Sequence, residues 1–222
     1  TVENNYIHDA SLTGIFIYGT PSDNPSHDNI IRNNRLYRNQ DTGIYITGRN
    51  NLIEGNEIWG TAQCHPTMIA IIGVSACTWG NQMDANGMTF FGQGHIIRNH
   101  YIHDIIMGPD RINPSIDDYS ASPPNDPHID CFQTWSSSYG EAASNILFEG
   151  NRCNLLKNQA VEHGGTGWMF ADASNITIKN NITELRVGIN TTGGGNHHLS
   201  IYNNVFAGDD LTYPNTNYLE GV

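Results

Sequence analysis

A six-residue pattern that returns seven times constrains the fold of this 222-residue chain more than any other feature. The pattern reads apolar, any, any, Asn, any, apolar, and a few copies replace one of these residues. The copies begin at Val2, Ile31, Ile53, Ile97, Phe148, Ile178 and Ile201. Their fourth residues are 22 to 30 residues apart, except for two longer intervals of 44 and 51 residues. Repeats at such an interval are typical of solenoids, in which each repeat forms one coil.

A shorter pattern follows most copies and reads inward, outward, inward, which is the period of a strand with one buried face. Its copies are Gly14–Ile17, Gly43–Ile46, Met68–Ile71, His128–Cys131, Ala160–His163 and Gly188–Thr191. Helical periodicity is not sustained anywhere in the sequence. We therefore predict two or three short strands in each coil, joined at corners rich in Asn and Gly. Stacked coils would place the repeated Asn side chains one above another, where their amides can form a hydrogen-bonded ladder.

Through its seven copies, the sequence resembles the right-handed parallel β-helix superfamily, which has the pectate-lyase-like fold. This superfamily includes polysaccharide lyases, some glycoside hydrolases, uronate epimerases and phage tailspikes. The resemblance implies an all-β, right-handed parallel β-helix of about seven coils, forming a single domain over residues 1–222. Long insertions are expected at about residues 74–94 and 103–127, and the first segment could instead contain an irregular coil. The fold hosts several chemistries and some structural proteins, so it does not by itself define a function.

The charge of the chain limits its partners. The formal net charge is −12 at pH 7, with only 10 basic residues. Nucleic acids and anionic membrane surfaces are bound by clustered Lys and Arg, so neither partner is expected. No apolar run approaches the roughly 20 residues of a membrane span, so membrane insertion is not expected either. An acidic polysaccharide is the expected partner of a secreted or cell-surface protein of this kind, and it would need a bridging cation or a basic side chain.

The four cysteines lack the paired spacing of a zinc site. Cys64 and Cys77 flank one short segment and could pair in an oxidising compartment. Cys131 and Cys153 fall at inward strand positions, where a free cysteine acts as a small apolar filler. The chain begins and ends in repeat-like sequence without an obvious capping helix. An oligomer is therefore expected if the coil ends are covered by a partner rather than by caps.

The outward position of the shorter pattern predicts a candidate site. Across the coils this position reads Phe16, Tyr45, Ala70, Asp130, Glu162 and Asn190. Equivalent residues of adjacent coils lie about 4.8 Å apart, so Asp130 and Glu162 are expected to be neighbours. Two adjacent carboxylates repel unless a cation, a shared proton or a basic group lies between them. Ca²⁺ accepts several carboxylate oxygens, and we predict it as the metal bound by this pair.

Two histidines flank the predicted acid pair and could act as acid or base near neutral pH. His128 directly follows the long 103–127 insertion. His163 falls at an inward position, so it belongs either to the site or to the core as a hydrogen-bonded residue. Arg111 and Tyr119 lie within the insertion and are candidate substrate-binding residues.

Two aromatic residues share the outward column with the acids. Phe16 and Tyr45 could stack on sugar rings, which makes them candidate substrate-binding residues as well. Single exposed aromatic residues are also common on strands, and this alternative reading remains.

The segment Asp126-Pro127-His128 is similar to the Asp-Pro-His signature of mannuronan C5-epimerases and related alginate-acting β-helix enzymes. The Asp and the His of that signature belong to the catalytic site, so the resemblance implies catalytic roles for Asp126 and His128. The family has an aromatic-Gly stretch before the motif and an acid directly after it. This chain has Ser122-Pro123-Pro124-Asn125 before the motif and Ile129 after it.

These features favour an enzyme that cleaves a uronate-containing polysaccharide by β-elimination. That reaction needs a neutralised sugar carboxylate, a base for the C5 proton and an acid for the leaving oxygen. The candidate catalytic residues are Asp126, His128, Asp130, Glu162 and His163. The alternative enzymes are a glycoside hydrolase and a uronate epimerase. The alternative from another class is a non-catalytic structural or carbohydrate-binding solenoid, such as a tailspike shaft or an adhesin.

Overall fold

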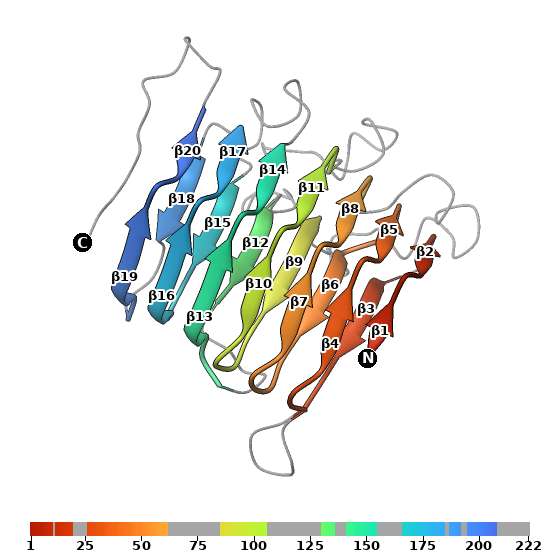
Figure 1. Cartoon of the computed structure of the whole chain (residues 1–222), viewed down its shortest axis with the longest axis horizontal. Helices are drawn as coiled ribbons and strands as arrows, with labels where there is room; N and C mark the ends of the chain where they lie inside the picture. Colours follow the sequence, from red (N-terminus) through yellow and green to blue (C-terminus); the bar gives the residue numbers. More distant parts are fainter. Residues whose placement is uncertain are drawn as a thin grey trace, which may run out of the picture.

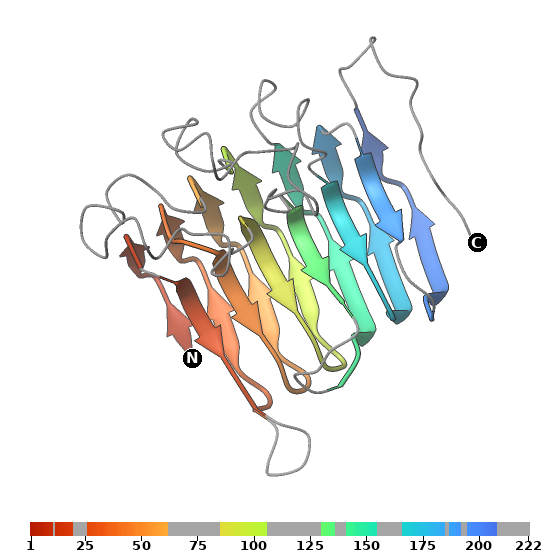
Figure 2. The same cartoon turned by 180° about the vertical axis from the view of Figure 1, so that it is seen from behind.

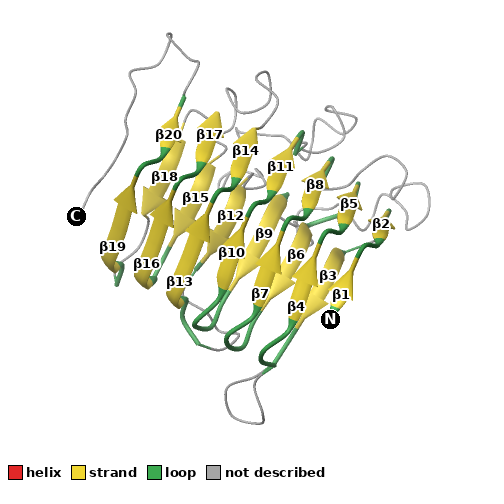
Figure 3. Ribbon diagram, viewed as in Figure 1, coloured by secondary structure: helices red, strands yellow, loops and turns green. Residues whose placement is uncertain are grey.

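The fold is a parallel β-helix built from three parallel sheets (Figures 1 and 3). A computed structural model describes residues 1–10, 12–19, 26–61, 85–105, 130–135, 141–154, 166–184, 187–191 and 195–207. All regular elements within these ranges are strands. The chain passes through the sheets in a fixed order and then moves to the next coil. Figures 1 and 2 show this path as a right-handed coil. The predicted all-β, right-handed parallel β-helix is confirmed.

Sheets A and B each contain seven strands, and sheet C contains six. Sheet A consists of β1 (Val2–Glu3), β4 (Ile30–Arg32), β7 (Leu52–Glu54), β10 (Ile96–Arg98), β13 (Ser144–Glu149), β16 (Ser174–Lys179) and β19 (His197–Tyr202). Sheet B consists of β2 (Tyr6–His8), β5 (Arg35–Tyr37), β8 (Glu57–Trp59), β11 (Tyr101–His103), β14 (Arg152–Asn154), β17 (Ile182–Glu184) and β20 (Val205–Phe206). Sheet C consists of β3 (Thr13–Ile17), β6 (Thr42–Ile46), β9 (Asn86–Phe90), β12 (Asp130–Thr134), β15 (Thr166–Phe170) and β18 (Val187–Thr191).

The sheet C strands of two coils differ from their sequence assignments. The sequence pattern placed one of them at Ala160–His163, outside the described residues, whereas the strand between β12 and β18 is β15 (Thr166–Phe170). The other is the sheet C strand of the third coil. The sequence pattern placed it at Met68–Ile71, which lies outside the described residues. In the structure β9 pairs with β6, with Met88 opposite Ile44. The segment 74–94 therefore contains a strand of sheet C, as the irregular-coil alternative allowed.

The corners of the coil use the left-handed backbone conformation at intervals of five residues. Such residues have φ near +55°, a region that Asn, Asp and Gly enter at the lowest cost. They precede the sheet A strand at Asp28, Asn50 and Gly94 and are its second residue at Asn145, Asn175 and His198. They separate sheets A and B at Asn4, Asn33, Gly55, Asn99, Gly150, Asn180 and Asn203. A third set follows sheet B at Asp9, Arg38, Gly60 and Asp104. The abundance of Asn and Gly in the sequence is thus explained by the corners.

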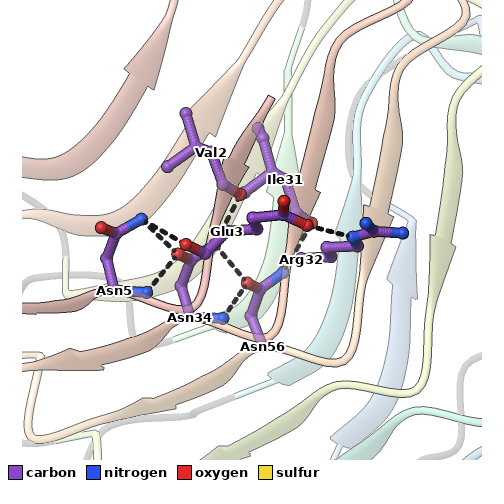
Figure 4. A network of polar contacts seen from close by, with 7 residues as sticks. All are labelled: Val2, Glu3, Asn5, Ile31, Arg32, Asn34 and Asn56. Atoms are coloured by element: carbon purple, nitrogen blue, oxygen red, sulfur yellow. Dashed lines mark hydrogen bonds and ion pairs between the residues drawn. The ribbon is translucent and has the colours of Figure 1, made fainter.

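The second residue of the corner between sheets A and B forms the predicted Asn ladder. Asn34 accepts hydrogen bonds from the backbone N–H and the side chain of Asn5 through its Oδ1, each at 3.0 Å. Its Nδ2 donates to the carbonyl of Val2, also at 3.0 Å. Asn56 makes the same contacts with the coil of Asn34 (Figure 4). Each side chain thereby satisfies a corner N–H and a carbonyl of the preceding coil.

His100 replaces asparagine in the middle of this ladder. Its Nδ1 accepts the backbone N–H of Asn56 at 3.1 Å, and its Nε2 lies 3.1 Å from the carbonyl of Ile53, to which it donates. The ring is therefore neutral, with its proton on Nε2. Burial lowers the pKa of His100 from 6.5 to about 4. His95 has the same kind of position next to Asn51, and burial also lowers its pKa.

The side chains that point into the β-helix from the three sheets form one continuous apolar core. The column of sheet A contains Ile31, Ile53, Ile97, Phe148 and Ile178, all fully buried. Sheet C contributes larger rings, including Phe132 stacked on Trp168 at a centroid distance of 5.2 Å.

Cys131 and Cys153 form a disulfide in this core, with a Cα–Cα distance of 6.2 Å. The prediction of two free, filling cysteines was therefore wrong. In the neighbouring coils the position of Cys131 is a glycine, because a Cβ at Gly87 would lie 2.6 Å from Cγ2 of Ile102. Ile102 is the register partner of Cys153. Compared with the preceding coil, Cys131 thus takes the position of a glycine and Cys153 takes the position of an isoleucine. Two unbonded side chains at these positions would collide, whereas two cysteines can form a bond.

We predict that His100→Asn makes the protein less sensitive to acid. The unfolded chain binds a proton at this histidine below about pH 6.5, whereas the folded protein does so only near pH 4. The contribution of His100 to stability should therefore be fully present above pH 6.5 and be lost as the pH falls toward 4, by up to about 1.4 kcal/mol per pH unit. Urea unfolding at pH 7 and pH 5 should show a smaller pH difference for His100→Asn. His27→Asn, at an exposed site, is the control. An equal pH difference in wild type and His100→Asn would contradict the assignment.

A second prediction concerns the disulfide. Closing a loop of 22 residues should stabilise the fold by about 3 kcal/mol in the chain-entropy model. Reduction should lower the free energy of unfolding of the wild type by about that amount. The double variant Cys131→Gly/Cys153→Ile should fold and be less sensitive to reductant by the same amount. Equal sensitivity of the two proteins would show that this disulfide does not contribute.

Candidate functional site

Two outward-facing columns run along sheet C and contain the described part of the candidate site. The first column is the first residue of β3, β6, β9, β12 and β15: Thr13, Thr42, Asn86, Asp130 and Thr166. The second column is Phe16, Tyr45, Thr89, Gln133, Met169 and Asn190. The two columns touch, because the hydroxyl groups of Thr42 and Thr89 lie 3.2 Å apart.

The register of β12 differs from the predicted register. We expected Asp130 to align with Tyr45 and to neighbour Glu162, but the register partner of Asp130 is Thr166. The residue of β12 that aligns with Tyr45, through Thr89, is Gln133. The predicted strand alignment of Asp130 with Glu162 was wrong, and Glu162 itself lies outside the described residues.

The shift of three residues has a physical cause. Ile129-Asp130-Cys131 and Phe132-Gln133-Thr134 both alternate inward and outward residues, so the pattern alone allows both registers. The observed register buries Phe132 completely against Trp168 and Phe148. The predicted register would instead place Phe132 on the outer face, whereas the observed register buries both Cys131 and the Phe132 ring, so packing favours the observed register.

Asp130 lies in a buried polar cluster that links three coils. The residue is only 2% exposed. Its Oδ1 accepts a hydrogen bond from the hydroxyl of Thr166, and its backbone N–H donates to Oδ1 of Asn86 at 3.2 Å. The side chain of Asn86 in turn donates to Oε1 of Gln133. A carboxylate held in this way has a fixed orientation, which suits a group that binds a cation or moves a proton.

Aromatic rings form a strip along the same face of sheet C, which we call the aromatic strip. It contains Phe16, Tyr18, Tyr45, Phe91 and Trp135. Phe16 lies 5.6 Å from Tyr18 and 4.9 Å from Tyr45 between ring centroids. Tyr45 lies 5.6 Å from Phe91, which lies 4.8 Å from Trp135. The strip therefore runs along the coil axis toward the strand that carries Asp130.

The exposure of the aromatic strip changes along its length. Phe16 is 55% exposed and Tyr18 is 47% exposed, whereas Phe91 is 1% exposed. The sequence predicted Phe16 and Tyr45, which are register partners. It did not identify Phe91 and Trp135 as members of the aromatic strip. Each of these residues directly follows the last residue of a sheet C strand, as Tyr18 does, and that shared position is the signal that could have identified them.

The remaining predicted site residues lie outside the described residues. These are Arg111, Tyr119, Asp126, His128, Glu162 and His163. Their roles remain predictions, and the same holds for a Ca²⁺ ion bound by Asp130 and Glu162. Within the described ranges, no three His, Cys, Asp or Glu side chains gather closely enough to hold a metal ion. No helix in this part of the chain is long and apolar enough to cross a bilayer.

Comparison with known proteins adds no assignment, because no protein-family model and no curated protein matches this chain.

The polar cluster gives a prediction for Thr166→Val. This change keeps the side-chain shape but removes the hydroxyl that donates to Asp130. Loss of a hydrogen bond to a buried carboxylate should lower the free energy of unfolding by about 1 to 3 kcal/mol. Urea unfolding at pH 7 measures the loss. Thr177→Val, on the outer face of sheet A, is the matched control and should change stability by less than about 0.5 kcal/mol. Equal effects of the two substitutions would contradict a special role of the Thr166 hydroxyl.

Proposed function

We propose that this protein binds an acidic, uronate-containing polysaccharide along the outer face of sheet C and cleaves it by β-elimination. The proposal includes an extracellular or cell-surface location, where such polymers occur. The observation that carries it is the aromatic strip, which runs along the coil axis on the same face as the buried carboxylate of Asp130.

The geometry of the strip suits a polymer rather than a small ligand. Adjacent coils are about 4.8 Å apart, so rings from successive coils form a row parallel to the rod axis. Rings of this kind stack on the apolar faces of sugars. Phe16 and Tyr18 are about half exposed and offer ring surface to a ligand. An extended sugar chain lying on them would point along the strip toward β12.

Sheet B also carries aromatic rings, and the ring of Trp59 among them is covered by its neighbours. Trp59 stacks on Tyr37 at 5.0 Å and on His103 at 5.9 Å. The guanidinium of Arg35 lies 5.0 Å from the Trp59 ring centroid. Trp59 is therefore a poor surface for stacking on sugars, whereas Tyr6 on the same sheet is as exposed as Phe16 and serves as the comparison for sheet C.

The proposed reaction assigns a task to each predicted group. A base, His128 or Tyr119, removes the proton from C5 of the uronate. The C5–H electrons form a C4–C5 double bond, the C4–O bond breaks, and an acid protonates the leaving oxygen. Asp126 and His163 are further candidates for these proton transfers. Arg111, or Ca²⁺ held by Asp130 and Glu162, would neutralise the sugar carboxylate so that the C5 proton can leave.

One observation favours the alternative of a non-catalytic, carbohydrate-binding solenoid. Asp130 is 2% exposed and hydrogen-bonded between coils, which is also what a purely structural carboxylate would show. The two functions differ in their dependence on Asp130. Asp130→Asn should abolish cleavage but keep polymer binding if the protein is a lyase.

The assay incubates the protein with a panel of uronate polysaccharides, with and without a chelator. New ultraviolet absorbance from the C4–C5 double bond would support β-elimination. Reducing ends without that absorbance would indicate a glycoside hydrolase, and a changed sugar configuration without cleavage would indicate an epimerase. Binding without any product would support the non-catalytic alternative. No binding and no product across the panel would contradict the proposed function.

The aromatic strip gives a binding prediction. Phe16→Ala and Tyr45→Ala should each weaken binding of a uronate oligosaccharide by about threefold to tenfold, because each removes one stacking ring. Tyr6→Ala is the matched control, since Tyr6 is equally exposed, at 55%, but lies on sheet B. Calorimetric titration measures the three affinities. An equal loss for Tyr6→Ala would place the sugar on another face.

A further inference from the structure

The outer face of sheet A carries an aliphatic column at its centre. Register pairs align Ile30, Leu52, Ile96 and Leu147 on the second to fifth strands of the sheet. Ile96 is 39% exposed, and the other three side chains are partly exposed. The column then becomes polar, at Thr177 and Ser200.

A second column on the same face alternates in charge. From β1 to β16 it reads Glu3, Arg32, Glu54, Arg98, Glu149 and Lys179. Neighbours form ion pairs within the chain: Arg32 Nε lies 2.6 Å from Glu3, Lys179 Nζ lies 3.0 Å from Glu149, and Arg98 pairs with Glu54. The first six strands of sheet A thus present a regular row of opposite charges.

We propose that sheet A is the interface of a two-fold symmetric dimer with a second copy of this chain. The two-fold axis runs parallel to the strands, between β7 and β10. The two rods then lie face to face with their long axes in opposite directions. In this arrangement β1, β4 and β7 of one copy face β16, β13 and β10 of the other.

The charge column is self-complementary in this arrangement. Glu3 faces Lys179, Arg32 faces Glu149, and Glu54 faces Arg98 of the second copy. Every acid therefore meets a base. Because complementary charges set register and exclude wrong partners, this row specifies one alignment of the two rods.

The aliphatic column selects the same alignment independently. With the axis between β7 and β10, Leu52 faces Ile96 and Ile30 faces Leu147, so four aliphatic residues of each copy are buried together. A shift by two coils would keep the charges complementary but would expose half of these residues. The other face-to-face arrangement, with the axis along the rod, would place the charged column on the aliphatic column. Both columns therefore favour one symmetric dimer.

The size of the face predicts a weak dimer. Six strands spaced about 4.8 Å apart, with two to six residues each, cover a flat area of roughly 360 Å² per copy, or about 730 Å² in total. That area lies below the roughly 1,000 Å² of specific interfaces and is typical of weak, transient contacts. The dimer should form reversibly and depend on protein concentration. It does not depend on the function proposed for sheet C.

Sedimentation equilibrium of the wild type should show a monomer–dimer equilibrium. Ile96→Asp should weaken it by about tenfold or more, because a charge would be buried against Leu52 of the second copy. Ile182→Asp is the matched control, since Ile182 is 41% exposed but lies on sheet B. Circular dichroism confirms that both variants fold. A wild type that stays monomeric at the highest concentration, or an equal effect of both substitutions, would overturn the proposal.

A mixing experiment separates contacts between copies from contacts within one chain. Glu54→Lys places two bases in the central positions, and Arg98→Glu places two acids there. Each variant alone should dimerise more weakly than the wild type, because like charges meet across the axis. An equimolar mixture should form the heterodimer, since bases now face acids. Mixing cannot restore the ion pair within either chain. Native mass spectrometry that shows no preference for the heterodimer would overturn the proposed interface.

Discussion

The structure depends on satisfying the backbone at the corner between sheets A and B. Where the chain turns from sheet A to sheet B, it leaves the regular hydrogen bonding between parallel strands. The N–H and carbonyl groups of this corner would then be buried without partners. One side chain per coil supplies hydrogen-bond partners for these groups. Its oxygen, or Nδ1 of His100, accepts the corner N–H of the preceding coil, and its nitrogen donates to a carbonyl of that coil. The same contacts recur at Asn151, Asn181 and Asn204.

The ladder explains why the fold could be predicted from the sequence. The left-handed corner needs Asn, Asp or Gly, and the ladder position needs a side chain with both donor and acceptor, so both requirements leave a readable pattern at a fixed spacing. The ladder also tolerates His100, because a neutral imidazole offers one acceptor and one donor. The chemistry of the corner, rather than the identity of one residue, therefore defines the repeat.

The candidate site was less predictable because it lies where the repeat is interrupted. Both registers of β12 satisfy the inward and outward alternation, and only the packing of Phe132 against Trp168 separates them. The disulfide was missed for the same reason, since Cys131 reaches Cys153 only from the position that other strands give to glycine. The alignment of Phe16 with Tyr45 on the outer face could be predicted because β3 and β6 belong to uninterrupted coils. Local sequence patterns thus define the β-helix, whereas long-range packing determines which residues lie at the candidate site on sheet C.

The three sheets present different chemistry to their surroundings. Sheet A offers alternating charges beside aliphatic residues, and sheet B offers rings that contact one another and arginine. Sheet C offers exposed rings on the same face as a buried carboxylate, three strands away from it. A dimer through sheet A would leave sheet C accessible, so the proposed assembly and the proposed binding surface are compatible.

A crystal structure with a bound uronate oligosaccharide tests the central claim most directly. The account predicts sugar rings stacked on Phe16 and Tyr45, with the chain extending along the coil axis toward β12. A sugar chain bound across sheet A or sheet B, with the aromatic strip of sheet C uncovered, would contradict it.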